Sequence, residues 1–233
     1  MICQPINRLN LHSIDAVEQT VSGPEVAAGW CKDAFKKLLE GTVLSIDQLI
    51  HCLSDREINQ STAYSGILAP ETADDIIAAT SRQFLNDNNK GNTAAVKIKQ
   101  LWACECDPHA QEEILAHPSS PICCFDNLVS FAPPKVQKYI KTKKTKAGPQ
   151  YVREMLDESK MNTKAWCVVH GRECPIKYSD VHTAGNTCTD HSNFGKRVRM
   201  AGQHSKYFFI WAALMRQLKN QNYHRREREA IRQ

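Results

Sequence analysis

The sequence predicts an α/β protein with a mostly parallel sheet flanked by helices. An extended run at residues 58–66 ends in glycine and is followed by an amphipathic stretch at 71–85. A second extended run, 99–106, precedes Asp107, which is placed to cap another helix reaching about residue 115. Strand, glycine corner and helix in succession are the opening unit of a Rossmann-like fold, where the corner lets a ligand approach the backbone.

The middle of the chain continues with shorter elements. Residues 122–131 predict an extended run, which Pro133-Pro134 ends, and residues 150–158 predict a helix. Six lysines and no acidic residue fall within 135–146. A run of this kind is typical of a solvated or disordered segment and only in a minority of cases contacts DNA directly.

The last elements contain the most distinctive residues. The apolar run 165–169 predicts a central strand of the sheet, and 180–184 predicts the strand beside it. Residues 185–202 are rich in small, polar and basic residues, as in a loop, and 206–218 predict a helix. Cys188 thus follows a strand, with four cations close behind it. Neighbouring positive charge stabilises a thiolate, and basic side chains in a loop suit phosphate contacts.

Three segments divide the chain. Residues 1–55 predict an N-terminal arm with two helices, at 25–39 and 45–53. Residues 56–220 hold the α/β domain, and residues 221–233 form a basic tail.

Composition narrows the class of protein. The chain has 233 residues, 42% of them hydrophobic, which is enough for a real core. No apolar run is long enough to span a bilayer, and the N-terminus lacks a basic region followed by a hydrophobic one. We therefore expect an intracellular protein without a membrane partner, nuclear if its source is eukaryotic. Its ten cysteines lack a secretion signal, so we expect most of them to be reduced.

Charge is distributed unevenly along the chain. Residues 1–134 carry 9 Lys+Arg against 17 Asp+Glu, whereas residues 135–233 carry 21 against 8. The net charges are therefore −8 and +13. The second part has the charge expected of a surface that faces nucleic acid, although solvated lysine-rich faces on an ordinary domain explain the same numbers equally well.

Cysteine and histidine also occur at metal-ligand spacing. Cys167, His170 and Cys174 could contribute three zinc ligands, with a fourth from Cys104, Cys106, Cys123 or Cys124. The doubled cysteine pair that marks many zinc sites is absent from this stretch. Buried free cysteines are the commoner explanation, so we predict no metal site.

The stretch around Cys188 resembles motif IV of the cytosine-5 DNA methyltransferases. In that family a Pro-Cys-Gln turn precedes Phe-Ser-x-x-Gly, a glycine-containing loop and a helix. Cys188, Ser192, Gly195 and Gly202 keep the family spacing, and so does the aromatic run Tyr207-Phe208-Phe209. The family places its nucleophile at the cysteine, so the resemblance implies that Cys188 is catalytic.

Three earlier stretches are similar to motifs I, II and III of the same family, in the family order. Residues 63–71 look like the motif Phe-Ser-Gly-Ile-Gly-x-x-Glu, which cradles S-adenosylmethionine. Residues 103–110 resemble motif II, whose acidic residue accepts ribose hydroxyls, and Asp126 is similar to the motif III aspartate that meets the adenine amino group. The implied cofactor-binding residues are Tyr64, Ser65, Gly66, Ile67, Glu71, Glu105 and Asp126.

The resemblance implies a methyltransferase acting on DNA, or on RNA as one branch of the family does. The enzymes extrude a cytosine, add the cysteine thiolate to C6 and thereby activate C5 for methylation. Side chains of the loop after the nucleophile would contact the nucleic acid: Ser192, Lys196, Arg197 and Arg199.

Two other interpretations remain open. Thr187 and Leu68 replace a proline and a glycine of the family motifs, and the sequence contains no Glu-Asn-Val motif, whose glutamate polarises the cytosine in the family. A catalytically inactive homologue that binds nucleic acid or protein is therefore the alternative, and a zinc-bearing interaction module is a third. We expect the methyltransferase-like domain to be C-terminally incomplete, with an unpaired sheet edge that favours self-association.

Overall fold

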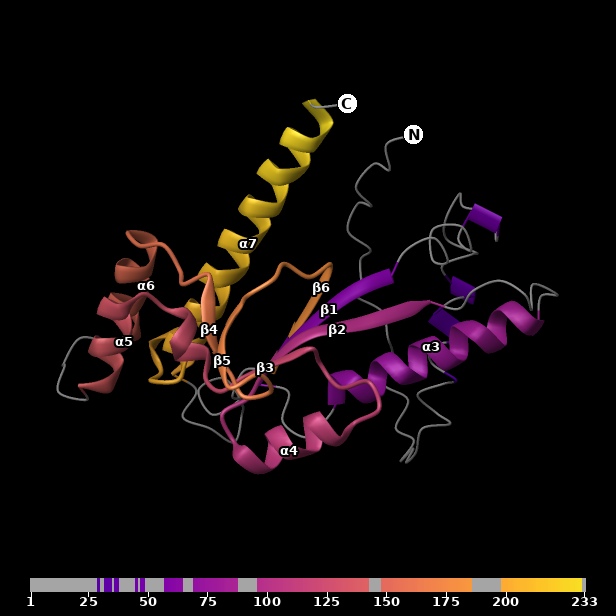
Figure 1. The fold of residues 1–233 in the computed structure, drawn as a ribbon, viewed down its shortest axis with the longest axis horizontal. Coiled ribbons are helices and arrows are strands. Elements are labelled where there is room, and N and C mark those ends of the chain that lie inside the picture. The colour runs from indigo at the N-terminus through magenta and orange to yellow at the C-terminus, as the bar shows by residue number, and fades with distance from the viewer. Residues whose placement is uncertain are drawn as a thin grey trace.

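A computed structural model describes residues 57–64, 69–87, 96–142, 148–185 and 198–231, together with isolated positions between residues 29 and 48 (Figure 1). The two predicted N-terminal helices lie mostly outside this part of the chain. Most of residues 185–202, including Cys188, is also outside it.

Six strands form one mixed sheet in the order β5-β4-β3-β2-β1-β6. Four of them are parallel, β1, β2, β3 and β6, whereas β4 is antiparallel to both β3 and β5. Their bounds are β1 Glu57–Ala63, β2 Lys97–Cys104, β3 Cys123–Phe125, β4 Lys164–Cys167, β5 Arg172–Pro175 and β6 Val181–Ala184. A mostly parallel α/β sheet flanked by helices is therefore confirmed, and its arrangement is consistent with a Rossmann-like fold.

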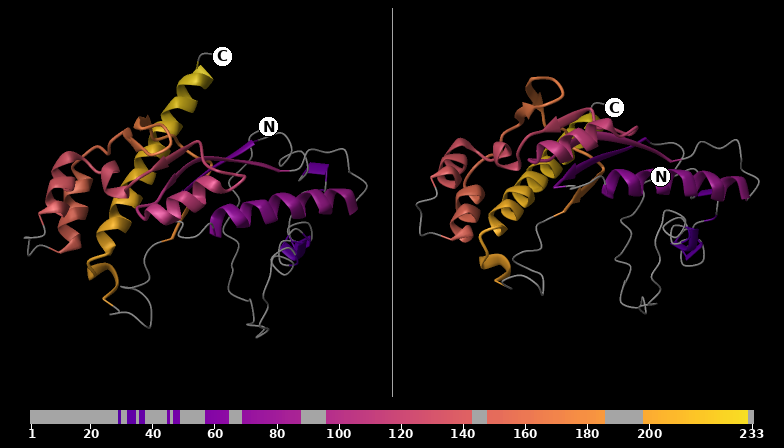
Figure 2. Two further views of the ribbon diagram at one scale, coloured as in Figure 1. Left: turned by 60° about the horizontal axis from the view of Figure 1, so that its bottom comes forward. Right: turned by 90° about the horizontal axis from the view of Figure 1, so that it is seen from below.

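Helices occupy the connections from β1 to β2, from β2 to β3 and from β3 to β4, and another helix follows β6 (Figure 1). The α-helices are α3 Ala69–Asp87, α4 Pro108–Ala116, α5 Pro134–Lys141, α6 Pro149–Asp157 and α7 Ser205–Ile231. The described residues also form the short 3-10 helices η1 Leu128–Phe131 and η3 Arg199–Ala201. In both rotated views α5 and α6 lie together, and α6 packs beside α7 (Figure 2).

Four predicted helices correspond to α3, α4, α6 and α7. The cap of α4 is as expected, because the Asp107 side chain accepts hydrogen bonds from the backbone N–H groups of His109 and Ala110. Helix α7 runs well beyond the predicted end at residue 218, so the expected boundary at residue 221 between domain and tail falls inside one continuous helix.

Two predictions for the middle of the chain were wrong. The extended run expected at 122–131 is only the three-residue strand β3, because the Asn127 side chain accepts a hydrogen bond from Val129 N and starts η1. The lysine-rich segment is not solvated throughout. Its first part is α5, in which Val136 is fully buried and Tyr139 and Ile140 pack against the core.

The predicted central position of the strand at 165–169 was also wrong. Strand β4 lies outside β3, four strands away from β6, and it pairs with β5 in a hairpin. Trp166, Val168 and Val169 are exposed, which an apolar central strand would not allow. The strand that leads toward Cys188 instead lies beside β1.

Helix α7 covers one face of the sheet with apolar and aromatic side chains. Trp102 on β2 packs edge to face against Phe125 and Phe131, at ring-centroid distances of 5.9 and 5.7 Å. His182 on β6 lies 5.0 Å from the Trp102 ring and stacks on Trp211 of α7. These rings form the centre of the core, to which Ile210 and Leu214 of α7 add fully buried side chains.

Helix α3 faces β1 and β2 through polar groups. The Thr62 hydroxyl donates to Glu71 Oε1 at 3.2 Å, and the Gln100 amide donates to Asp74. All four side chains are buried. A register shift after Gln60 gives β2 one extra residue, which lets Gln100 face α3 while Trp102 faces α7.

Partly buried His182 predicts a loss of stability in acid. Burial lowers its pKa to about 4, whereas the unfolded chain has an ordinary value near 6.5. Because only the unfolded chain takes up this proton between these values, stability falls as pH drops from about 6.5 to about 4, by on the order of 3 kcal/mol. A His182→Asn variant has no imidazole to protonate, so its stability in urea unfolding should lack this contribution. Asparagine is chosen because its amide keeps a hydrogen-bond partner for Ser61, whose hydroxyl lies 2.6 Å from His182 Nδ1.

The pH dependence of stability must be compared between variants, because titration of Asp74 changes stability in the opposite direction to that of His182. Burial raises its pKa to about 6, so its contribution to stability grows as pH falls from about 6 to about 4. His109→Asn is the matched control, because the His109 side chain is 94% exposed. Equal pH profiles for His182→Asn and His109→Asn would contradict the prediction.

Candidate functional site

The carboxyl ends of the four parallel strands meet along one edge of the sheet. Tyr64, Glu105, Asp126 and Gly185 are the residues that directly follow β1, β2, β3 and β6. The chain first builds β1, β2 and β3 toward one side and then returns to place β6 on the other side of β1. Ligands of open α/β sheets bind at such a point of reversal, outside the carboxyl ends of the strands.

Glu105 ends β2 as expected, and its carboxylate is held by the backbone. Glu105 Oε1 accepts hydrogen bonds from Cys106 N at 2.7 Å and Asp107 N at 3.1 Å. The Gln111 side chain donates to the Glu105 carbonyl oxygen at 2.5 Å, which fixes the same turn from α4. With Oε1 engaged twice, Oε2 is the oxygen left for a ligand.

Asp126 lies at the neighbouring strand end and contains an unsatisfied acceptor. Its Oδ1 atom is buried and has no hydrogen-bond partner among the residues that the structure describes. Burial and the nearby Cys167, Glu105 and Asp126 raise the pKa of the adjacent Cys124 thiol to about 12. Cys124 therefore stays protonated beside these carboxylates, and the edge is acidic in character.

Glu71 is completely buried in the first turn of α3. Thr62 satisfies one of its carboxylate oxygens, while Oε2 is buried and has no partner within the described part of the chain. A buried carboxylate oxygen without a donor is costly in a folded protein. Glu71 therefore offers a second acceptor close to the end of β1.

Tyr64 forms the corner after β1. It has φ of 55°, the left-handed conformation that non-glycine residues rarely adopt, and its N–H donates to Cys104 O at 2.9 Å. Its ring packs edge to face on Tyr207 of α7, 6.2 Å between centroids. Burial raises the pKa of its hydroxyl well above the usual range, and no described residue forms a hydrogen bond with the hydroxyl.

Gly185 ties β6 to this corner. Its N–H donates to Ala63 O at 3.0 Å, and a Cβ atom at this position would lie 2.5 Å from Tyr64 O. Only glycine fits that close approach. The residues that follow lead to Cys188, and the chain is described again from residue 198, just before α7 returns Tyr207 to Tyr64.

Several predicted site residues lie outside the described part of the chain. They are Cys188, Ser65, Gly66, Ile67, Ser192, Lys196 and Arg197. Arg199 is described: it is exposed, begins η3 and has φ of 51°. Its carbonyl oxygen accepts hydrogen bonds from Gly202 N and the Ser205 hydroxyl, which stabilise this unusual conformation and start α7.

Comparisons with known proteins add no relative. No protein-family model matches the sequence, and no curated protein matches it at a significant level. Among the described helices, none has both the length and the apolar character needed to cross a membrane. The methyltransferase resemblance therefore rests on the motif residues.

One group of side chains was not assigned to a site from the sequence. Cys123 begins β3, and Cys167, His170 and Cys174 belong to the β4–β5 hairpin, yet all four lie together. The spacing of the last three contained the signal. The sequence did not identify the fourth ligand, because four cysteines were equal candidates. The order of strands decides between them, since it places the hairpin beside β3.

Proposed function

We propose that this chain carries the cofactor site and the nucleophile of a DNA cytosine-5 methyltransferase. The main support is the position of β6 beside β1. Both strands end at the same edge, and Gly185 contacts the backbone of Tyr64. Cys188 follows Gly185 by three residues, which span at most about 11 Å of extended chain. The backbone of Cys188 is thus no farther than this from Gly185, which contacts the corner where β1 ends and motif I begins.

The described residues offer acceptors that suit the adenosine portion of S-adenosylmethionine. Asp126 Oδ1 is a buried acceptor that needs a donor, as an adenine amino group provides. Glu105 Oε2 lies at the next strand end, where a carboxylate accepts from ribose hydroxyls. The residues that would hold the methionine portion, Ser65 to Ile67, are outside the described residues.

The chain's own chemistry would centre on Cys188. As a thiolate it would add to C6 of an extruded cytosine, which raises the electron density at C5. When bound, S-adenosylmethionine supplies the electrophilic methyl group. Loss of the C5 proton would then expel the thiolate and restore the aromatic ring. The cations of residues 196–206 would lower the pKa of the thiol and bind the phosphate backbone.

A first experiment measures cofactor binding. Calorimetric titration of the purified protein with S-adenosylmethionine should show one site, and Asp126→Ala should weaken it about 5- to 20-fold by removing the buried acceptor. Asp157→Ala is the control, because Asp157 is exposed and pairs with Arg216 on α6 and α7. No heat of binding, or equal affinities for both variants, would refute the cofactor assignment.

A second experiment traps the nucleophile. DNA that contains 5-fluorocytosine should form a covalent adduct in the presence of S-adenosylmethionine, because fluorine at C5 blocks release of the thiolate. Peptide mapping should place the adduct on Cys188, and Cys188→Ser should abolish it. Cys106→Ser, which alters an exposed thiol, should not. A protein that binds cofactor and DNA but forms no adduct would instead support the inactive nucleic-acid-binding homologue.

A further inference from the structure

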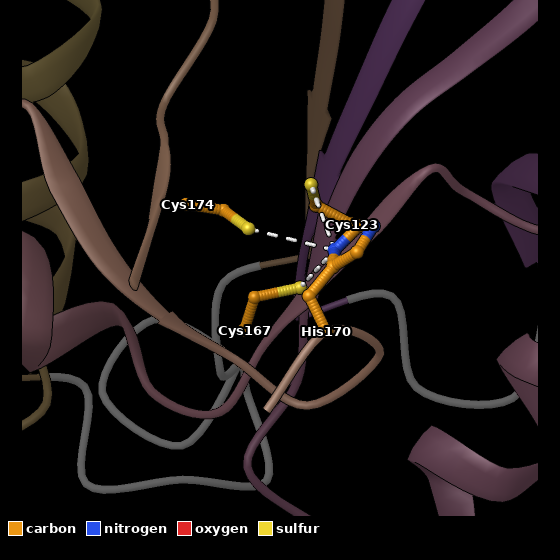
Figure 3. Close-up of side chains that lie close together, drawn as sticks. All are labelled: Cys123, Cys167, His170 and Cys174. Atoms are coloured by element: carbon orange, nitrogen blue, oxygen red, sulfur yellow. Dashed lines mark hydrogen bonds between the residues drawn. The ribbon is translucent and has the colours of Figure 1, made fainter. Parts of the chain in front are cut away.

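Four potential metal ligands converge from two parts of the sheet (Figure 3). Their ligand atoms all lie within 4.8 Å of one another. Nδ1 of His170 is 3.2 Å from the sulfur of Cys167, 3.4 Å from that of Cys174 and 3.8 Å from that of Cys123. Figure 3 shows the sulfurs of Cys123, Cys167 and Cys174 around the His170 ring, with the three dashed lines meeting at Nδ1.

Ordinary hydrogen bonds do not account for this arrangement. One ring nitrogen takes part in a single hydrogen bond, as donor or as acceptor, yet three sulfurs surround Nδ1 here. Tetrahedral zinc with Zn–S near 2.3 Å and Zn–N near 2.05 Å separates sulfur from nitrogen by about 3.6 Å. The three observed separations lie on both sides of that value.

The hairpin backbone is shaped to present these ligands. Gly171 N donates to Cys167 O at 2.9 Å, closing a tight turn in which Gly171 has φ of 58°. This hydrogen-bonded turn fixes Cys167 and His170, two of the four potential ligands, relative to each other.

We propose that Cys123, Cys167, His170 and Cys174 bind one Zn²⁺ ion in a structural site. Three thiolates and one imidazole suit zinc, and harder cations such as Mg²⁺ and Ca²⁺ prefer oxygen ligands. Four protein ligands complete a tetrahedron and leave no position for a reacting water, so the ion is structural. This inference is independent of the proposed methyltransferase function.

The metal would hold an otherwise weakly attached hairpin. Strand β4 is joined to β3 through the pair Phe125 and Cys167 and a hydrogen bond from Val168 N to Cys124 O. Ligands on both sides of this short contact would fasten the β4–β5 hairpin to the sheet. They would also fix the start of β3, three residues before Asp126 at its other end.

Metal analysis of the full chain purified from zinc-supplemented medium tests the site. The wild-type protein should contain about one zinc per chain, and Cys174→Ser should lose at least about nine-tenths of it. His170→Cys should retain the metal, because four thiolates also bind zinc tetrahedrally. Cys106→Ser, which changes an exposed thiol outside the cluster, should retain it as well. A zinc-free wild-type protein, or full zinc content in Cys174→Ser, would overturn the proposal.

Cobalt provides a second measurement if Cys174→Ser does not fold. Wild-type protein produced with Co²⁺ should show the intense visible absorption of a tetrahedral ion together with thiolate charge-transfer bands. His170→Cys should shift those bands, since a nitrogen ligand becomes sulfur. A weak octahedral spectrum, or a spectrum that this substitution leaves unchanged, would exclude the assigned ligands.

Discussion

Gly185→Ala should destabilise the domain by about 2 kcal/mol or more. The new methyl group would lie 2.5 Å from the carbonyl oxygen of Tyr64, a distance that real Cβ atoms essentially never show. Neither the new Cβ atom nor the Tyr64 carbonyl oxygen can move without the backbone. Strand β6 must therefore move away from β1, and the hydrogen bond from Gly185 N to Ala63 O must lengthen or break. Urea unfolding followed by circular dichroism measures the loss.

Gly148→Ala is the matched control, because no atom lies within 4 Å of a Cβ built there. Gly148 has φ of −71°, which alanine adopts without strain. The control should change stability by less than about 1 kcal/mol. If the Gly185 variant is as stable as the control, β6 does not approach Tyr64 as described. Should Cys188 be the nucleophile, Gly185→Ala should also reduce its adduct with 5-fluorocytosine DNA.

Trp102→Ala should have a still larger effect, about 3–5 kcal/mol. The Trp102 side chain is 1% exposed and contacts Phe125, Phe131 and His182. Its indole N–H also donates to Lys177 O at 2.8 Å, which holds the chain leading into β6. Removal therefore leaves a cavity between the sheet and α7 and frees that carbonyl. The midpoint of urea unfolding should fall accordingly.

Trp166→Ala separates this effect from the mere loss of a tryptophan. The Trp166 side chain, on β4, is 50% exposed. We expect a change of less than about 1 kcal/mol for this variant, measured by far-ultraviolet circular dichroism, which does not depend on tryptophan emission. Similar unfolding midpoints for the two variants would contradict the position assigned to Trp102 at the centre of the core.

Local signals in the sequence were enough to predict the first strands and helices of the parallel sheet. The strand, corner and helix at the start of the domain correspond to β1 and α3, and Asp107 caps α4 as its side chain predicts. Glu105 lies at the end of β2 as predicted, whereas Asp126, which was expected inside a longer strand, directly follows β3. The correctly predicted features depend on neighbouring residues, whose preferences can be read directly.

Predictions that depended on distant partners were less successful. The apolar run at β4 suggested a central strand, but the tight turn at Gly171 returns the chain at once, so β4 pairs with β5 in an antiparallel hairpin at the sheet edge. Cys123 could not be distinguished from three other cysteines as a companion of His170, because only the order of strands brings it to the hairpin.

Strand β6 is the last strand in the sequence but pairs with the first, β1, which has a consequence for folding. The Asn59 side chain of β1 donates a hydrogen bond to the Asp180 carboxylate, just before β6, across 121 residues of sequence. Strands β1, β2 and β3 make nearer contacts and close smaller loops, so they should assemble first on the emerging polypeptide. Strand β6 would then dock last, after the carboxylate-lined edge formed by the ends of β1, β2 and β3 is in place.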